Sequence, residues 1–294
     1  MSRRALRIVS WNIQWGRGID GRVDLTRTAR VARAFDADVL CLQEVAVNHP
    51  GLPGGGAGDQ VAILARLFPG YAAIYSAGSD LSDGLCGRRQ FGELILSRLP
   101  IFQVFRHLLP WPADPAVPSM QRTAVEAVIE ASFLPGGALR VLTTHLEYYS
   151  ALQRSAQVEA LLDICANGYR HAVAPRSTAE TDPPFAVLPR GEGVVLCGDF
   201  NFSPRAVEYP RMQDSVADGV PRLVDVWPCV HGGSSHAPTA GVHAATFTGG
   251  PECFDFFFVS ENLRPMIAGI EVDQSTNASD HQPVILDLLM SCGN

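Results

Sequence analysis

The sequence contains no lysine, so arginine carries every one of its fixed positive side-chain charges. Arginine binds phosphate through a planar fork of N–H groups, although an all-arginine chain rich in Ala, Gly and Pro is explained more simply by a GC-rich genome. No run of residues approaches the roughly 18 apolar residues of a membrane span. The first residues also lack the apolar segment and cleavage site of a secretory signal, so we expect a cytoplasmic protein with no membrane span.

Cysteine occurs without any spacing typical of a metal site, and its seven copies are odd in number. Cys41 and Cys197 lie inside apolar runs, where a thiol acts as a small hydrophobic side chain. We therefore expect reduced thiols and no disulfide framework.

Positive charge is in the minority, with 23 arginines against 30 acidic residues and a net charge of −7. This balance disfavours broad electrostatic binding to nucleic acid but still allows a local basic cleft. The sequence shows no clear aromatic and basic tract for stacking on single strands, and no amphipathic helix of the lipid-docking type. Its 294 residues, 47% hydrophobic and 18% charged, are typical of a soluble globular protein with a large core.

Apolar runs alternate with helical patterns and predict an α/β protein that opens with a β-α-β unit. Residues 6–11 are expected to form a strand ending at Asn12, and residues 24–35 a helix capped by Asp24. Residues 38–43 are expected to form a buried strand ending at Glu44. The other expected elements are strands at 71–76, 92–97, 101–107, 121–131, 138–144, 193–197, 253–259 and 284–289, helices at 59–68 and 149–166, and loops at 48–58 and 228–244.

The segment 171–191 contains Pro and Arg and is the one candidate for a domain boundary. The polar motifs lie on both sides of it and would have to share one site, so we predict a single domain over residues 1–294. The likeness of residues 39–44 to residues 194–199 fits one duplicated architecture.

Acids, amides and imidazoles stand at the ends of the expected strands. Strand ends that meet at one edge of a sheet can deliver such groups to a single place, which is how a metal-assisted, phosphate-cleaving site would be built. No obligate protein partner is evident. The residues are Asn12, Glu44, His145, Asp199, Asn201, Asp280 and His281.

Asp199 and Asn201 lie two residues apart after a buried run, so both side chains can point to one side. The carboxylate can take a proton from water and the amide can orient that water, while the structural alternative is an Asx turn. Glu44 offers the hard oxygen ligand that Mg²⁺ prefers, and its alternative is a solvated strand end. Asn12 could equally be a turn or cap residue.

Asp255 is an acid in a very apolar segment, where an unpartnered carboxylate is costly. We predict that it pairs with His281 and fixes the tautomer and charge of that imidazole. His145 is a candidate phosphate contact or leaving-group acid, or else a core histidine. Arg122 could hold substrate phosphate or be a surface charge. The pair at residues 88–89 is more typical of solvated arginines.

Taken together, these segments resemble the endonuclease/exonuclease/phosphatase superfamily, also called deoxyribonuclease I-like. The combination of Gly-Asp199-Phe-Asn201 with a terminal Ser-Asp280-His281 is the most specific part of the resemblance. Two positions depart from the family pattern: Cys253 stands where an arginine is frequent, and Glu93 stands where many members have asparagine. The matching segments are 11–14, 42–44, 91–98, 122–124, 144–146, 198–201, 254–256 and 279–281, which together span nearly the whole chain.

The resemblance implies a four-layer α/β sandwich, with two packed mixed β-sheets flanked by helices and a site at one end of the sheets. It also implies hydrolysis of a phosphate ester, with a phosphodiester preferred, that depends on Mg²⁺ or Mn²⁺. The number of metal ions, and the choice of Asp199 or His281 as general base, stay open.

The implied roles follow the matching residues. Glu44, Asn12 and Asp280 would bind the metal, and Asp199 would take the proton of the attacking water, which Asn201 positions. His281, oriented by Asp255, would stabilise the transition state. The phosphate would be contacted by Asn12, Arg122 and His145.

The sequence does not identify the substrate. The superfamily includes DNA and RNA nucleases, phosphoinositide phosphatases, sphingomyelinases and protein–DNA adduct hydrolases. We expect a nucleic acid or a small phosphodiester first, and a lipid-headgroup phosphodiesterase or phosphatase of the same superfamily second. A catalytically silent phosphate-binding module is a third reading, which the intact set of polar residues disfavours.

Overall fold

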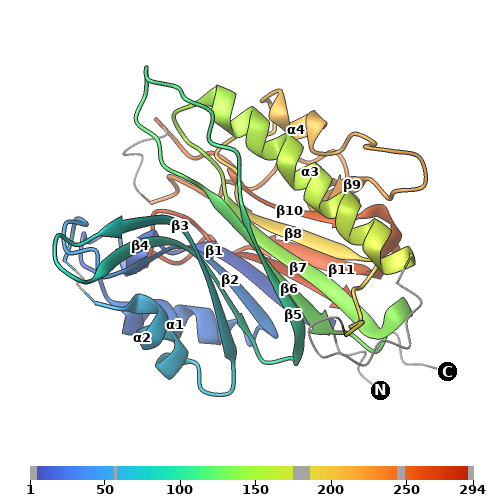
Figure 1. Ribbon diagram of the computed structural model, residues 1–294, viewed down its shortest axis with the longest axis horizontal. Helices are drawn as coiled ribbons and strands as arrows, with labels where there is room; N and C mark the ends of the chain where they lie inside the picture. Colours follow the sequence, from blue (N-terminus) through green and yellow to red (C-terminus); the bar gives the residue numbers. More distant parts are fainter. Residues whose placement is uncertain (1–4, 56–57, 175–185, 244–248, 291–294) are drawn as a thin grey trace.

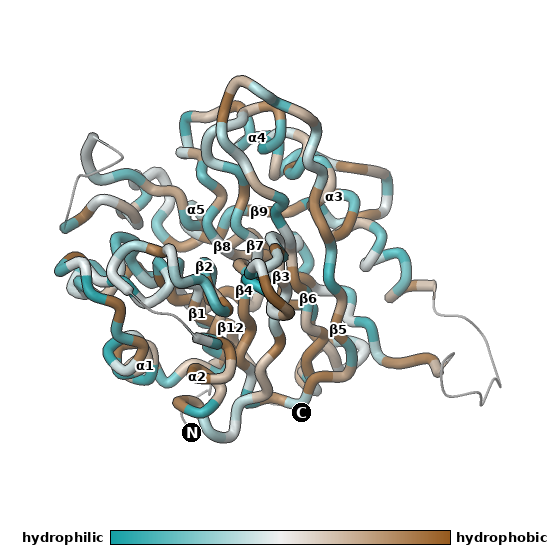
Figure 2. Tube along the Cα trace, turned by 60° about the vertical axis from the view of Figure 1, so that its left-hand side comes forward, coloured by the Kyte–Doolittle hydropathy of each residue, from teal (hydrophilic) through white to brown (hydrophobic). Residues whose placement is uncertain are grey.

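The computed structural model describes residues 5–55, 58–174, 186–243 and 249–290. Two six-stranded mixed sheets pack face to face, and helices cover their outer sides (Figure 1). The apolar parts of the chain gather in the strands at the centre, while polar segments lie in the outer loops (Figure 2). The predicted four-layer α/β sandwich is therefore confirmed.

The first sheet has the strand order β11-β12-β1-β2-β4-β3, in which only β1 and β2 run parallel. The helices α1 (Leu25–Ala34) and α2 (Gln60–Leu67) pack on its outer face. The strands are β1 (Ala5–Asn12), β2 (Val39–Val47), β3 (Ala72–Ser82), β4 (Arg88–Ser97), β11 (Ile267–Val272) and β12 (Val284–Leu289).

The second sheet has the order β5-β6-β7-β8-β10-β9, in which only β7 and β8 run parallel. The long helix α3 (Ala151–Val173) packs on its outer face, and the short helices α4 (Glu208–Arg211) and α5 (Val226–His231) follow later in the chain. The strands are β5 (Ile101–Leu108), β6 (Thr123–Glu130), β7 (Ala138–His145), β8 (Val194–Asp199), β9 (Leu223–Asp225) and β10 (Asp255–Ser260).

The core between the sheets is made by every second residue of the strands, because successive side chains of a strand point to opposite faces. Val141 of β7 and Cys197 of β8 lie in this inner core, while their neighbours Leu142 and Leu196 pack toward α3. Both faces of each central strand are thus buried, which explains why the strands read as continuous apolar runs.

Several local predictions are confirmed. Asp24 caps α1 by accepting from the backbone N–H groups of Thr26 and Arg27, and Asp59 caps α2 in the same way. The six cysteines in the described part of the chain are all free thiols, and Cys41 and Cys197 are fully buried. Within the described ranges, no helix is long and apolar enough to cross a membrane.

Other local predictions were wrong. β2 does not end at Glu44 but continues to Val47, and the expected loop at 228–244 begins inside α5. β9 and β11 were not predicted, because one has three residues and the other is a half-exposed strand at the edge of its sheet. Of the expected connection at 171–191, residues 175–185 lie outside the described residues.

Candidate active site

The polar strand ends meet at one end of the two sheets. Asp199 is the register partner of His145 on one side and of Asp255 on the other, so three site residues stand at the same level of the second sheet. Asn12 is the last residue of β1, which lies in the facing sheet. The predicted convergence of these strand ends is present in the structure.

Each of these side chains continues a row of inward-facing core residues. Cys197 and Phe257 both lie in the core between the sheets. Asp199 stands two residues after Cys197, and Asp255 stands two residues before Phe257. The period of two along a strand therefore turns each acid toward the opposite sheet. The site is the end of the inner core, at which polar residues replace apolar ones.

Glu44 reaches the site through an irregularity in β2. The pairing of β2 with β4 shifts register between Leu42 and Val45, and Glu44 has a φ of 60°, in the left-handed region. A β-bulge commonly redirects a side chain next to an active site. Here it places Glu44 Oε1 3.1 Å from Asn12 Nδ2 and 3.8 Å from His145 Nδ1.

Asn12 links acids that come from both sheets. Its Nδ2 donates to Glu44 Oε1 at 3.1 Å and to Asp199 Oδ2 at 3.0 Å, while its Oδ1 accepts from the backbone N–H of Gln14. The side chain is almost fully buried. Its amide hydrogens hold the two acids at a fixed separation while its Oδ1 makes the Asx-turn contact, so the turn alternative and the site contacts occur together.

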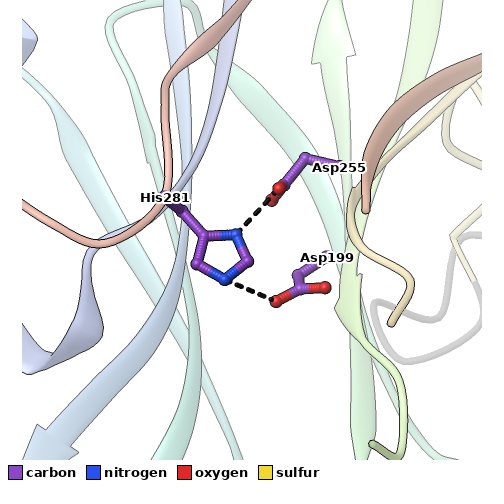
Figure 3. A group of neighbouring side chains, drawn as sticks. All are labelled: Asp199, Asp255 and His281. Atoms are coloured by element: carbon purple, nitrogen blue, oxygen red, sulfur yellow. Dashed lines mark hydrogen bonds and ion pairs between the residues drawn. The ribbon is translucent and has the colours of Figure 1, made fainter. Parts of the chain in front are cut away.

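His281 lies between two carboxyl groups (Figure 3). Its Nδ1 contacts Asp255 Oδ2 at 2.8 Å, the pairing predicted from the sequence, and its Nε2 lies 3.6 Å from Asp199 Oδ2. Burial opposes the charged imidazole, but Asp255 and Asp199 outweigh it and raise the pKa of His281 well above its usual range. The two acids therefore favour the charged form of the His281 imidazole.

His145 is held as a neutral imidazole. Burial, reinforced by Arg122, lowers the pKa of His145 to about 3. Asn201 Nδ2 donates to His145 Nε2 at 2.8 Å and to the carbonyl of Leu146 at 2.9 Å, which leaves the hydrogen of His145 on Nδ1. The backbone N–H of Asn201 donates to Asp199 Oδ1, so the Asx turn and the functional arrangement occur together.

Three contacts that sequence reasoning missed position the chain segment before β12. Trp11 Nε1 donates to the carbonyl of His281, and Ser279 Oγ donates to the carbonyl of Asn12. Gln14 Nε2 donates to Asp280 Oδ2 at 2.6 Å. All three residues lie in segments that carry the family resemblance, and a buried indole N–H always calls for an acceptor.

Arg122 is buried, which rules out its reading as a surface charge. It lies just before β6, and its Nε contacts Glu147 Oε2 at 3.2 Å. Its charge is close enough to lower the pKa of His145. Of the arginine pair on β4, Arg88 binds Asp80 and Arg89 donates to the carbonyl of Ser82, as expected of hairpin surface charges.

The family model described as the Endonuclease/Exonuclease/phosphatase family matches residues 9–281. The chain belongs to the endonuclease/exonuclease/phosphatase family. The matched range contains every predicted site residue. No curated protein sequence matches the chain.

Several solved structures superpose on nearly the whole chain. An endonuclease/exonuclease/phosphatase from Beutenbergia cavernae is 25% identical with a TM-score of 0.69, over 98% of this chain and 72% of the other. The human Nocturnin catalytic domain with bound sulfate anion is 19% identical with a TM-score of 0.62, over 98% and 95%. A mannosyl-6-phosphatase from Bacteroides thetaiotaomicron is 17% identical with a TM-score of 0.64, over 97% and 99%. The last two show the shared fold.

Members of this family typically depend on a divalent metal ion, and the donor set at the site fits one. Burial, followed by the nearby charge of Asp280, raises the pKa of Glu44 to about 7. An acid held in this way is stabilised by an added cation, and carboxylate oxygens are the ligands that Mg²⁺ prefers.

A second group of possible ligands is formed by Asp199, Asp255 and His281, whose ligand atoms lie within 4.8 Å of one another. His281 is itself the cation of that group, and a metal ion would have to displace its proton.

Proposed function

We propose that the protein is a divalent-metal-dependent phosphoesterase that hydrolyses a phosphodiester, in nucleic acid or in a small molecule, by attack of water. The observation that carries this proposal is the placement of Asp199. It lies between His281 and the Asn12 amide, and across from it stands Glu44, an acid that forms no ion pair with an arginine in the described part of the chain. One half of the site thus suits a phosphate and the other half suits a metal.

Glu44, Asp280 and Asn12 would hold Mg²⁺ or Mn²⁺, which supplies charge stabilisation at a phosphate oxygen when it is bound. Asp199 takes the proton of the attacking water, and Asn201, tied to it through the turn, orients the reacting groups. The neighbouring acids favour the protonated form of His281, which makes Asp199 the better candidate for the base. The imidazolium, oriented by Asp255, then stabilises the negative charge that grows on the phosphate.

His145 acts as a neutral hydrogen-bond donor. Asn201 occupies its Nε2, so the Nδ1–H is the group that can contact a phosphate oxygen or the leaving group. Arg122, behind it, disfavours a second positive charge on the imidazole and adds an attractive field for an anionic substrate. This arrangement separates the two histidines by charge, with one cationic and one neutral.

The test is hydrolysis of a substrate panel with Mg²⁺, Mn²⁺ or EDTA by the wild type, Asp199→Ala and the control Asp214→Ala, which changes an exposed carboxylate. The panel contains plasmid DNA, single-stranded DNA and RNA, a chromogenic phosphodiester, sphingomyelin and inositol phosphates. Loss of the general base is expected to lower metal-dependent turnover by about 10²–10⁴-fold. Full activity in Asp199→Ala would contradict the mechanism. Metal binding without turnover on any substrate would favour a catalytically silent phosphate-binding module.

A further inference from the structure

Glu93, one of the two departures from the family pattern, is a buried acid at the edge of the proposed site. It stands two residues before Ile95, which lies in the core between the sheets, so Glu93 also faces inward. The bulge of β2 that carries Glu44 lies directly opposite it, because Leu42 pairs with Leu94 and Val45 with Gly92.

The carboxyl group of Glu93 is not fully partnered. The side chain is 3% exposed, and in the described part of the chain its Oε2 has no hydrogen-bond partner. Buried polar atoms in proteins are nearly always paired, and an unpaired one calls for a group that the bare chain does not supply. Glu93 lies opposite the bulge that carries Glu44, so we take the missing partner to be a group of the bound substrate.

Arg122 lies beside Glu93 across the gap between the sheets. Ser76 is the register partner of Glu93, and Ser76 Oγ lies 2.8 Å from the hydroxyl of Thr123, the residue after Arg122. The electrostatics agree with this placement: burial raises the pKa of Glu93 well above its usual range, Arg122 opposes the shift and Glu44 adds to it. Glu93 thus lies between the metal side of the site and Arg122.

The site is therefore a row of polar pairs. Each pair joins a residue of the first sheet to a residue of the second, and successive pairs lie on neighbouring strands. Neighbouring strands β1, β2 and β4 carry the first-sheet members, and β8, β7 and the segment before β6 carry the others. The pair of Glu93 and Arg122 extends the row one strand beyond the reacting groups, where the rest of a bound substrate would lie. The pairs are Asn12 with Asp199, Glu44 with His145, and Glu93 with Arg122.

The chemistry of this last pair selects against a second anion. Arg122 is already bound to Glu147, so a phosphate in this place would meet one guanidinium and two carboxyl groups. An uncharged hydroxyl suits the place better, because it can donate to the unpartnered Glu93 oxygen and accept from the arginine. Asparagine, frequent here in the family, has an amide in place of the carboxyl group and cannot become negatively charged.

We propose that Glu93 and Arg122 form a subsite for a hydroxylated, uncharged part of the substrate next to the scissile phosphate. The preferred substrate is then a small phosphodiester of a polyol or sugar, and an extended polynucleotide is disfavoured. This inference rests on the proposed phosphoesterase function and narrows its substrate class.

The experiment compares kcat/KM for the methyl phosphodiesters of glycerol and of 1-propanol, which differ only in two hydroxyl groups. The wild type is expected to prefer the glycerol ester by about 10–100-fold, because a site built to bind a hydroxyl rejects the analogue that lacks it. Glu93→Ala should abolish this preference by slowing the glycerol ester alone, and Glu93→Gln should restore part of it. Glu130→Gln, an exposed change on the facing sheet, is the matched control.

A single-stranded oligonucleotide tests the charge argument. Glu93→Asn replaces the carboxyl group by an amide that cannot become negatively charged, and it is expected to raise kcat/KM for the oligonucleotide while lowering it for the glycerol ester. Equal losses on both small esters in Glu93→Ala would mean a structural role only, and an unchanged preference would mean no contact with the substrate. Either result overturns the subsite.

The proposed function can fail separately from the subsite. If the wild type hydrolyses neither ester, calorimetric binding of glycerol 3-phosphate and propyl phosphate to the wild type and Glu93→Ala still decides the matter. A preference for glycerol 3-phosphate that the variant loses supports the subsite without hydrolysis. Equal binding of the two compounds by the wild type contradicts it.

Discussion

Two groups of buried charges lie on opposite faces of the second sheet, and they are built in opposite ways. Under α3, Glu126 contacts Arg140 Nε at 2.8 Å, Arg190 Nη2 at 3.0 Å and His107 Nε2 at 3.3 Å. Burial alone would raise the pKa of Glu126, but His107 and the two arginines lower it to about 2. At the candidate active site, the pKa of Glu44 is instead raised to about 7.

The difference shows what separates a structural charge cluster from a site that needs a ligand. Glu126 has its cations within the chain, and Arg140 also donates to the carbonyls of Ile164 and Cys165 in α3. Glu44 has acids for close neighbours. A cavity of about 860 Å³ beside the Glu126 cluster, lined by Phe105, His107 and Arg190 among others, lies away from the strand ends that hold the candidate site. The raised pKa of Glu44 is therefore a better indicator of the active site than this cavity.

The largest expected effect comes from removing the acid of the structural cluster. Glu126→Ala leaves fully buried Arg140 without its counter-ion and should lower the free energy of unfolding by about 3–5 kcal/mol. Urea unfolding measures the loss, with exposed Glu130→Ala as the control. The kcat/KM of the folded fraction should stay unchanged. If Glu126→Ala were as stable as the wild type but had a much lower kcat/KM, Glu126 would belong to the active site and the distinction between the two clusters would be wrong.

The Glu126 cluster should also make the free energy of unfolding depend on pH. The folded pKa of Glu126 lies below its ordinary value of 4.5, so its contribution is complete above pH 4.5 and is lost as the pH falls toward 2. The shift corresponds to about 3 kcal/mol. Urea unfolding at pH 5 and pH 2.5 should show this loss in the wild type, beyond that of Glu126→Gln. Equal losses in both proteins would show that Glu126 is not held as an anion.

At the active site, Glu44→Gln should weaken Mg²⁺ binding by more than about 100-fold, because it removes a direct ligand, while stability without metal should hold or rise. In the wild type, affinity should rise about tenfold per pH unit up to pH 7 and level off above it, since the ion must displace a proton. Calorimetric titration gives both results. Binding that is independent of pH would place the metal elsewhere.

The smallest expected effect is that of Asp255→Asn. Asp255 is a positioning residue, because it acts through His281. The pKa of His281 should fall, which NMR titration would measure, and turnover at neutral pH should fall by about tenfold. The rate should recover at lower pH, where His281 regains its proton. A loss that does not depend on pH would indicate misfolding of the site.

The fold and the convergence of the polar strand ends could be predicted because the relevant signals are local. Asp199 ends an apolar run and Asp255 begins one, and a period of two along each strand sets the face to which they point. A buried acid needs a partner, which was sufficient to predict the pairing of Asp255 with His281. The single domain and the cytoplasmic location stay predictions.

What escaped prediction depends on contacts between distant segments. The bulge at Glu44 arises from pairing with β4, and no residue type in β2 signals it. The contacts of Gln14 with Asp280 and of Trp11 with the carbonyl of His281 join the two ends of the chain. Glu93 was seen only as a departure from a pattern, and its place opposite Arg122 needed both sheets.

The most direct test of the central claim is to measure turnover and metal binding together in Asp199→Asn. The account predicts that Mg²⁺ affinity stays within about threefold of the wild type, whereas hydrolysis of a phosphodiester falls by about 10²–10⁴-fold. Thermal unfolding of both proteins shows that the variant is folded. Turnover close to that of the wild type would contradict the assignment of Asp199 as the base and of this end of the sheets as the active site.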